Sequence, residues 1–277
     1  MDLNTIHQNY DFTGRTIVVT GGAGVLGGEM ACALAGCGAN VVIIDRDEDR
    51  AEGLVDRLGC WPGCSIAVYA DVLEKNTLEK ALEVILDEYD HVDALINAAG
   101  GNRSAATTSE DLSFFDIPEE AFQSVLNLNM VGTVLPSQVF GHHMAENDAG
   151  VILNISSMNA YRPLTRVPAY SAGKAAVSNF TRWLAVHMAQ EYSPEIRVNA
   201  IAPGFFHTKQ NHYLLYDEET EELTPRGQKI IDHTPMGRFG DPEDLLGVVL
   251  WLLSPASEFV SGVVIPIDGG FSAYSGV

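Results

Sequence analysis

The chain has 277 residues, 46% of them hydrophobic, which is enough to bury a sizeable core in one or two domains. Its 16 Lys and Arg stand against 37 Asp and Glu, and the formal charge of −21 argues against a nucleic-acid partner, because phosphates would be repelled. The apolar stretch at 248–253 is too short to span a bilayer, and the N-terminus lacks a signal-peptide pattern. We therefore expect a cytoplasmic protein with no membrane partner.

A short β-branched run at 16–20 predicts the first strand, and a glycine-rich turn follows it directly. A helix pattern then runs from about 29 to 36. Gly22, Gly24 and Gly27 form a G-x-G-x-x-G motif between strand and helix, the context in which this motif indicates a dinucleotide site. Glycine lets the backbone approach a pyrophosphate at the helix N-terminus, where free N–H groups and the helix dipole favour anions.

The second predicted strand, 40–44, ends at Asp45, about twenty residues beyond the glycine turn. An acid at this place accepts hydrogen bonds from the ribose hydroxyls of NAD and repels the 2′-phosphate of NADP. Arg46 is the next residue, and an arginine there can pair with that phosphate or stack on adenine. The pattern favours NAD and leaves NADP as the alternative.

Strand and helix patterns continue to alternate along the chain. We predict strands at 65–70, 92–96, 151–156, 196–201 and 263–267, and helices at 47–58, 77–88, 118–144, 169–190 and 242–253. This alternation indicates an α/β fold, a Rossmann-like, doubly wound parallel sheet of about seven strands flanked by helices, in a single domain over 1–277. Ligands of such sheets lie beyond the C-terminal strand ends. The long connection at 205–234, which carries an acidic run, predicts a substrate lid.

Chemically versatile side chains follow the strand predicted at 151–156. Ser157 stands at its tip, and Tyr170 and Lys174 are four residues apart on the next helix, so they share one face. A nearby ammonium favours phenolate over phenol, so we expect Lys174 to lower the pKa of Tyr170 toward neutrality. A tyrosine tuned in this way can transfer a proton near pH 7. Taken alone, such a Tyr–Lys pair is more often a surface pair.

Metal and disulfide chemistry is not indicated. The cysteines at 32, 37, 60 and 64 form no C-x-x-C pair and are interpreted as reduced structural residues. The eight histidines form no H-x-x-x-H set, so we expect no metal site.

These motifs together resemble the short-chain dehydrogenase/reductase family over essentially the whole chain. The resemblance rests on 20–27, 71–72, 97–100, Ser157, Tyr170, Lys174, 203–204 and Thr208. One departure is Val25, because the family's middle glycine usually lies there, whereas here Gly24 is one place earlier. The resemblance implies NAD contacts from Gly21, Gly24, Val25, Leu26, Gly27, Asp45, Arg46, Asp71, Val72, Asn97, Ala98, Ala99, Gly100, Tyr170, Lys174, Pro203, Gly204, Phe206 and Thr208.

The resemblance also implies a four-residue catalytic site. Tyr170 would be the general acid or base, Ser157 would orient the carbonyl, and Lys174 would tune Tyr170 and bond the nicotinamide ribose. Asn129 is the candidate fourth member, because it stands three residues before Gly132 as in the family pattern. The family is commonly tetrameric, so a homotetramer is expected on the same ground.

Three stretches, 97–102, 157–165 and 269–277, resemble family members that act on sugar acids. An anionic substrate of so acidic a protein needs a fixed cation near Tyr170, and Arg162, helped by Arg103, is the predicted carboxylate clamp. Asn159 is a candidate partner for sugar hydroxyls. A dehydrogenase for another sugar acid or a polyol stays open as the alternative, and a non-catalytic dinucleotide sensor is a remote one.

Overall fold

The computed structural model describes residues 8–59, 61–208, 212–217 and 220–276. Seven strands form one parallel sheet in the order β3-β2-β1-β4-β5-β6-β7. The strands are β1 (Thr16–Thr20), β2 (Asn40–Asp45), β3 (Ser65–Tyr69), β4 (Ala94–Asn97), β5 (Gly150–Ile155), β6 (Ile196–Pro203) and β7 (Val264–Ile267). The strand order reverses between β1 and β4, which creates the topological switch point where doubly wound sheets bind ligands.

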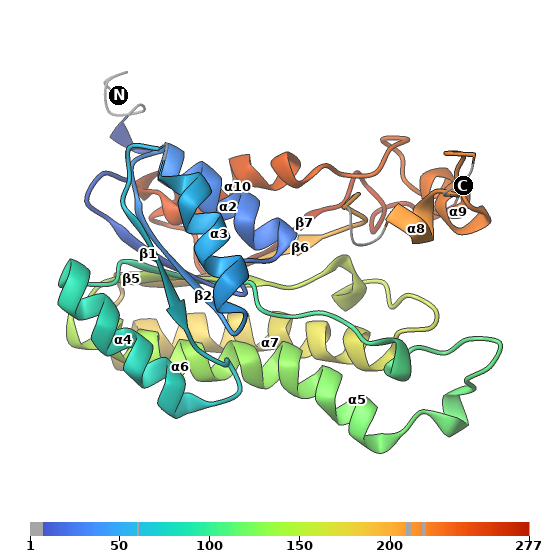
Figure 1. Ribbon diagram of the computed structural model, residues 1–277, viewed down its shortest axis with the longest axis horizontal. Helices are drawn as coiled ribbons and strands as arrows, with labels where there is room; N and C mark the ends of the chain where they lie inside the picture. The colour runs from blue at the N-terminus through green and yellow to red at the C-terminus, as the bar shows by residue number, and fades with distance from the viewer. Residues whose placement is uncertain (1–7, 60, 209–211, 218–219, 277) are drawn as a thin grey trace.

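Helices cover both faces of the sheet (Figure 1). They are α2 (Val25–Gly36), α3 (Glu48–Leu58), α4 (Lys75–Tyr89), α5 (Glu119–Leu126), α6 (Gly132–Glu146), α7 (Pro168–Glu191), α8 (His212–Leu215), α9 (Pro225–Asp232) and α10 (Leu246–Leu253). The predicted α/β fold is thereby confirmed.

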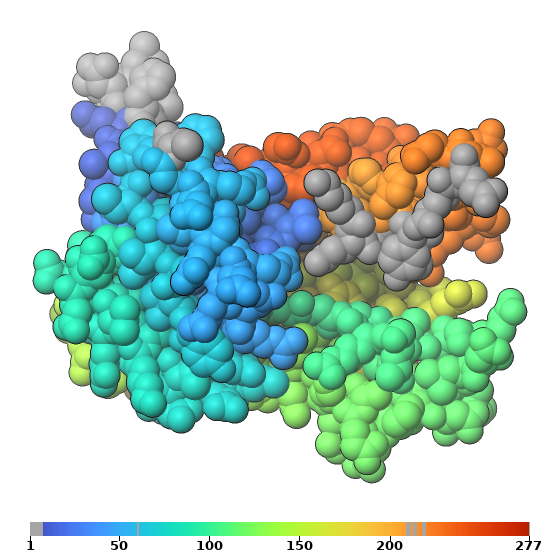
Figure 2. Space-filling view, viewed as in Figure 1, coloured from blue at the N-terminus to red at the C-terminus, as the bar shows by residue number. Residues whose placement is uncertain are grey.

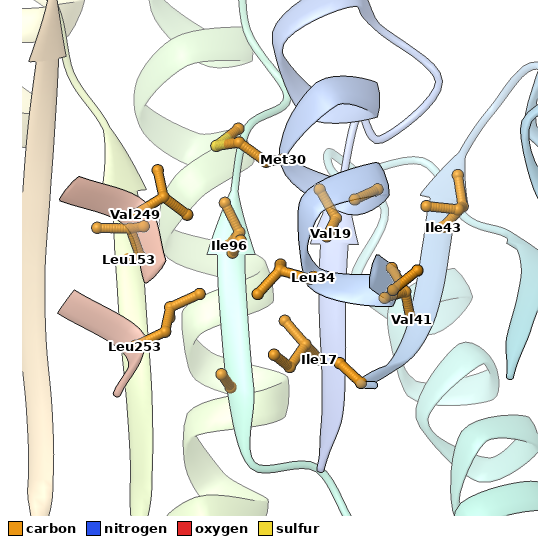
Figure 3. Close-up of a cluster of buried hydrophobic side chains, with 14 of the residues drawn as sticks. Ile17, Val19, Met30, Leu34, Val41, Ile43, Ile96, Leu153, Val249 and Leu253 are labelled. Carbon is orange, nitrogen blue, oxygen red and sulfur yellow. The ribbon is translucent and has the colours of Figure 1, made fainter. Parts of the chain in front are cut away.

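Two apolar cores lie on opposite faces of the sheet, because successive side chains of a strand point to opposite sides. Ile17 and Val19 of β1 pack with Leu34 of α2 and Val249 of α10 in one core (Figure 3). Val18, between them in sequence, belongs to the other core, which α4, α6 and α7 cover. Every residue of β1 is buried, which fixes the position of this strand and of the glycine turn that follows it.

Two helix predictions are corrected by the structure. The helix after the glycine turn begins at Val25 and not near residue 29, so Gly27 lies inside its first turn. The helix expected at 118–144 is broken by a π-helical turn at Asn127–Val131, between α5 and α6. The helix start was placed too late because the glycines at 27 and 28 have low helix propensity. The break at 127–131 was missed because a π-helical turn has no sequence periodicity of its own.

Several segments gather beyond the C-terminal strand ends. Figure 1 shows the 98–118 loop with α5, the connection after β5, and α8 with α9 at this same end of the molecule. Within the described ranges, no helix is long and apolar enough to cross a membrane, and no group of three His, Cys, Asp or Glu side chains could hold a metal ion. Cys32, Cys37 and Cys64 are free thiols, whereas Cys60 lies outside the described residues.

Candidate active site

A cleft of about 930 Å³ lies over the C-terminal ends of the strands. It is lined by the glycine turn and by the residues that follow β2, β3, β4, β5 and β6. Figure 2 shows part of the hollow between the 98–125 segment and the orange segment near residue 230. The candidate residues come from distant parts of the sequence and meet here because parallel strands end at one edge.

The glycine turn is shaped to let a ligand reach the backbone. Gly21 has a φ of +61°, and a Cβ there would lie 2.6 Å from the Cα of Ala99, so no other residue fits without a shift. Gly24 is the N-cap of α2 and carries no side-chain cap, and Gly24, Val25 and Leu26 all line the cleft. A helix N-terminus left open in this way fits the pyrophosphate of a dinucleotide.

The Asp45 carboxylate, at the end of β2, lies against the glycine turn. Its oxygens accept hydrogen bonds from the backbone N–H of Ala23 at 3.3 Å and of Asp47 at 3.2 Å. Arg46 and Arg50 line the cleft beside it, and Arg50 donates to the carbonyl oxygen of Ala23 at 2.8 Å. The sequence analysis did not identify Arg50 as a cleft residue. Its place in the first turn of α3, directly after β2, brings it there.

The residues after β3 and β4 form the adjoining wall. Asp71, Val72 and the stretch 98–100 line the cleft. Asn97 is not among the residues that line it, because its side chain points inward and donates to Ser137 Oγ at 3.0 Å and Asn154 Oδ1 at 2.8 Å. Asn97 thus ties β4 to β5 and α6 below the floor of the cleft.

Ser157, at the tip of β5, and Tyr170, on α7, lie on the same wall of the cleft. Burial raises the pKa of Tyr170 above its ordinary value, and the nearby hydroxyl of Ser157 only partly opposes this. The expected lowering of the Tyr170 pKa is therefore wrong, because the desolvation cost of a phenolate outweighs the other contributions.

Lys174 is 4% exposed, and its Nζ donates to the carbonyl oxygen of Ile155 at 2.7 Å. The ammonium lies 5.7 Å from the centre of the Tyr170 ring. Burial lowers the pKa of Lys174 to about 8, so at pH 7 its amine is protonated in most molecules. Ser156 fixes the same turn of α7, since its Oγ donates to the Lys174 carbonyl at 3.1 Å; its role was not predicted.

Asn129 lies at the centre of the π-helical turn and is fully buried. Its Nδ2 donates to the carbonyl oxygens of Val125 at 2.8 Å and Gly101 at 2.7 Å, and its Oδ1 accepts from the Gly101 N–H at 3.2 Å. π-Helical turns are frequent at functional sites. Here the turn lets a helix side chain hold the loop after β4 against the site. A Cβ on Gly100 would lie 2.9 Å from Asn129 Oδ1 and 3.1 Å from Lys174 Nζ, which places all three together.

The segment after β6 completes the cleft. The predicted cofactor contacts Pro203, Gly204, Phe206 and Thr208 all line it. A Cβ on Gly204 would lie 2.6 Å from the Cβ of Asp268, so this turn also requires glycine.

The predicted substrate residues do not meet. Arg103 lines the cleft. Asn159 lines a neighbouring cavity of about 550 Å³, and its Oδ1 accepts from the Leu164 N–H at 3.0 Å. Arg162 lines neither hollow, because its Nε donates to the Ser272 carbonyl at 3.1 Å and fastens its loop to the C-terminal segment. This contact gives Arg162 a role in fastening its loop, away from the hollow where the predicted clamp would lie.

The fold and the cleft define a nicotinamide-dinucleotide-dependent oxidoreductase. A family model described as enoyl-(acyl carrier protein) reductase matches residues 20–272. An uncharacterized oxidoreductase of Bacillus subtilis, UxuB, is 49% identical over 98% of this chain and 99% of its own. The chain belongs to the short-chain dehydrogenase/reductase family.

Solved structures of relatives superpose closely. A crystal structure of a candidate D-mannonate oxidoreductase from Haemophilus influenzae with bound NAD has a TM-score of 0.92, 43% identity, and coverage of 98% of this chain and 100% of that one. The gluconate 5-dehydrogenase of Burkholderia cenocepacia, in complex with NADP and tartrate, has a TM-score of 0.84 and 27% identity over 97% and 99%. The 5-keto-D-gluconate 5-reductase of Escherichia coli is 34% identical over 94% of this chain and 96% of its own.

Proposed function

We propose that the chain is an NAD-dependent sugar-acid oxidoreductase that interconverts D-fructuronate and D-mannonate. The observation that carries the proposal is that Ser157 and Tyr170 line the cleft that also holds the glycine turn, with Lys174 Nζ 5.7 Å from the centre of the Tyr170 ring. The choice of substrate is supported by the high similarity to the Haemophilus influenzae protein named for D-mannonate.

Proton transfer is the task that the proposal gives to Tyr170. Its raised pKa keeps the side chain a neutral phenol at pH 7, so it can donate a proton to the oxygen of a ketone that is being reduced. Ser157 would hold that oxygen and stabilise the negative charge that develops on it. The buried ammonium of Lys174 supplies a fixed positive charge close by, and Asn129 positions the loop that passes next to it.

The dinucleotide supplies or accepts the hydride. The open N-terminus of α2 would hold its pyrophosphate, and Asp45 its adenosine ribose. The Asp45 carboxylate is the support for NAD over NADP, since it would repel a 2′-phosphate. Arg46 and Arg50 beside it are the features that an NADP preference would use.

A substrate panel tests this proposal. Purified protein is supplied with NAD and D-mannonate, D-gluconate or an uncharged polyol, and the formation of NADH is followed by absorbance. The proposal expects the highest kcat/KM with D-mannonate. A preference for D-gluconate would favour the second candidate, a gluconate-type dehydrogenase, which the likeness to the Escherichia coli 5-keto-D-gluconate reductase supports. Dinucleotide binding without turnover on any of them would indicate a sensor.

Two further features belong to the proposal. The segment 205–234, with α8 and α9, would act as a lid, since it carries cleft residues at one end and has a small core of its own around Leu215 and Ile230. A homotetramer would cover the apolar side chains of Trp183 and Val186, each 56% exposed on α7. Light scattering coupled to size-exclusion chromatography measures the assembly directly.

A further inference from the structure

The outward face of α7 carries small side chains at one end and large ones at the other. This helix lies beside α6, on the face of the sheet opposite α2 (Figure 1). Its exposed residues recur every three or four positions, so they form one stripe along the helix. This α7 stripe consists of Ala172, Ala175, Asn179, Arg182, Trp183, Val186 and Gln190.

The composition of the α7 stripe is that of a contact surface. The stripe contains no Asp or Glu, although the chain has 37 of them, and Trp183 and Val186 are each 56% exposed. The ring of Trp183 is held in place, because it stacks on His187 and Phe180 with ring centres 4.7 and 6.2 Å apart. Aromatic side chains on a surface without carboxylates are typical of the core of a protein interface, and a ring that is already held loses little freedom on binding.

A cavity of about 550 Å³ lies at the alanine end of the α7 stripe. Ala172 and Ala175 form part of its wall, together with the apolar side chains of Phe114 and Pro168. Ser171 also lines this cavity; it is only 8% exposed, and its Oγ has no hydrogen-bond partner in the described part of the chain. Buried polar groups nearly always have a partner, so an unpaired hydroxyl beside an apolar hollow indicates that another group enters there.

The two ends of the α7 stripe fit each other when a second copy approaches in the opposite direction. Trp183 and Ala175 lie four residues on either side of Asn179, and Val186 and Ala172 lie seven residues on either side of it. A two-fold axis through Asn179 therefore places Trp183 opposite the partner's Ala175. The same axis places Val186 opposite the partner's Ala172. Each large side chain meets a small one, which is how close-packed surfaces interdigitate.

We propose that two copies of the chain pair through antiparallel α7 helices about a two-fold axis at Asn179, and that Trp183 of each copy fills the cavity of the other. The indole ring would be buried against the partner's Phe114. Its N–H, which can only donate, would meet the unpaired hydroxyl of the partner's Ser171. The inference depends on neither the substrate nor the reaction of the proposed function.

The filled cavity would lie against the segment that carries the proposed catalytic residues. Asn159, in its wall, is two residues after Ser157, and Pro168 is two residues before Tyr170. The second copy would therefore support the connection between β5 and α7 from outside, and the active site would be complete only in the pair.

Disulfide crosslinking tests the position of the axis without any turnover. Asn179→Cys places a thiol on the axis, where it meets the same thiol of the partner. With helix axes about 8–10 Å apart and Cα atoms about 2.3 Å from each axis, the two Cα atoms would be about 3–5 Å apart, close enough for a disulfide. Gln190→Cys is the matched control, because it lies eleven residues from the axis and its two copies would be about 33 Å apart. After mild oxidation, Asn179→Cys should run as a covalent dimer on a non-reducing gel, and Gln190→Cys should run as the unaltered protein does.

An exchange of large and small side chains tests the register. Trp183→Ala removes the contact and should halve the mass of the assembly, measured by light scattering coupled to size-exclusion chromatography. Ala175→Trp should have the same effect, because two tryptophans would then collide. The double variant Trp183→Ala/Ala175→Trp exchanges the two sizes and should restore the mass. Trp61→Ala removes a tryptophan that is 49% exposed and lies outside α7, and it should leave the mass unchanged.

Several results would overturn the pairing. A monomeric unaltered protein would do so, as would equal crosslinking of Asn179→Cys and Gln190→Cys, or a double variant that stays dissociated. The proposed function fails by a different result, namely no formation of NADH from any sugar acid, and that result would leave the crosslink and the mass unaffected.

Discussion

Replacing Lys174 with Met should change the stability of the protein by an amount that depends on pH in a defined direction. Burial lowers the pKa of Lys174 from 10.5 to about 8. Since one pKa unit is worth about 1.4 kcal/mol, holding the ammonium in the folded protein costs on the order of 3 kcal/mol. The cost is fully present below pH 8, where both folded and unfolded chains carry the charge, and it is lost as the pH rises from 8 to 10.5.

Urea unfolding of the two proteins at pH 7 and pH 10, at one protein concentration, measures this effect. The free energy of unfolding of the unaltered protein should rise by roughly 2–3 kcal/mol relative to Lys174→Met across this interval. Because the pKa of Tyr170 is raised in the folded protein, ionisation of this neighbour at high pH would lower the free energy of unfolding. It therefore does not contribute to the expected rise. Lys229→Met, which removes an exposed lysine of α9, serves as the control and should give a flat difference.

The refuting result is a Lys174→Met difference that does not change with pH. It would mean that the ammonium is as well solvated in the folded protein as in water. The fixed positive charge beside Tyr170 would then contribute little to the tyrosine, and the proposed role of Lys174 would be reduced to its hydrogen bond with Ile155.

Three further substitutions test other parts of the site. Tyr170→Phe should lower kcat by about two to four orders of magnitude and leave NADH affinity unchanged in fluorescence titrations; near-normal turnover would remove Tyr170 from the proton transfer. Asp45→Ala should weaken the binding of NAD and reduce the preference for NAD over NADP, measured as the ratio of the two kcat/KM values. An unaltered protein that already prefers NADP would contradict the role given to Asp45. Gly21→Ala, with its Cβ 2.6 Å from Ala99 Cα, should destabilise the fold by roughly 1–3 kcal/mol in thermal unfolding. Gly53→Ala on α3, where the added Cβ meets nothing within 4 Å, should instead be neutral or stabilising, and equal losses would refute the steric argument.

The order of strands and helices could be predicted because periodicity and turn residues are local signals. The β-branched run of β1 and the glycine turn after it define the first strand and the phosphate-binding turn without any tertiary information. Ser157, Tyr170 and Lys174 could be placed together for a similar reason, since a strand end and one helical turn fix their neighbourhood.

Properties that depend on long-range packing could not be predicted. The pKa of Tyr170 is decided by burial, which no spacing reveals. Arg162 was expected near the substrate, but the distant Ser272 carbonyl holds it. The π-helical turn that positions Asn129 has no periodicity of its own.

The reduction of D-fructuronate tests the central claim most directly. Purified protein is mixed with NADH and D-fructuronate, the loss of NADH absorbance is recorded, and the product is identified by nuclear magnetic resonance, with Tyr170→Phe assayed in parallel. We predict stoichiometric conversion to D-mannonate by the unaltered protein and a rate at least about a hundredfold lower for the variant. No consumption of NADH, or consumption that Tyr170→Phe leaves unchanged, would contradict the account.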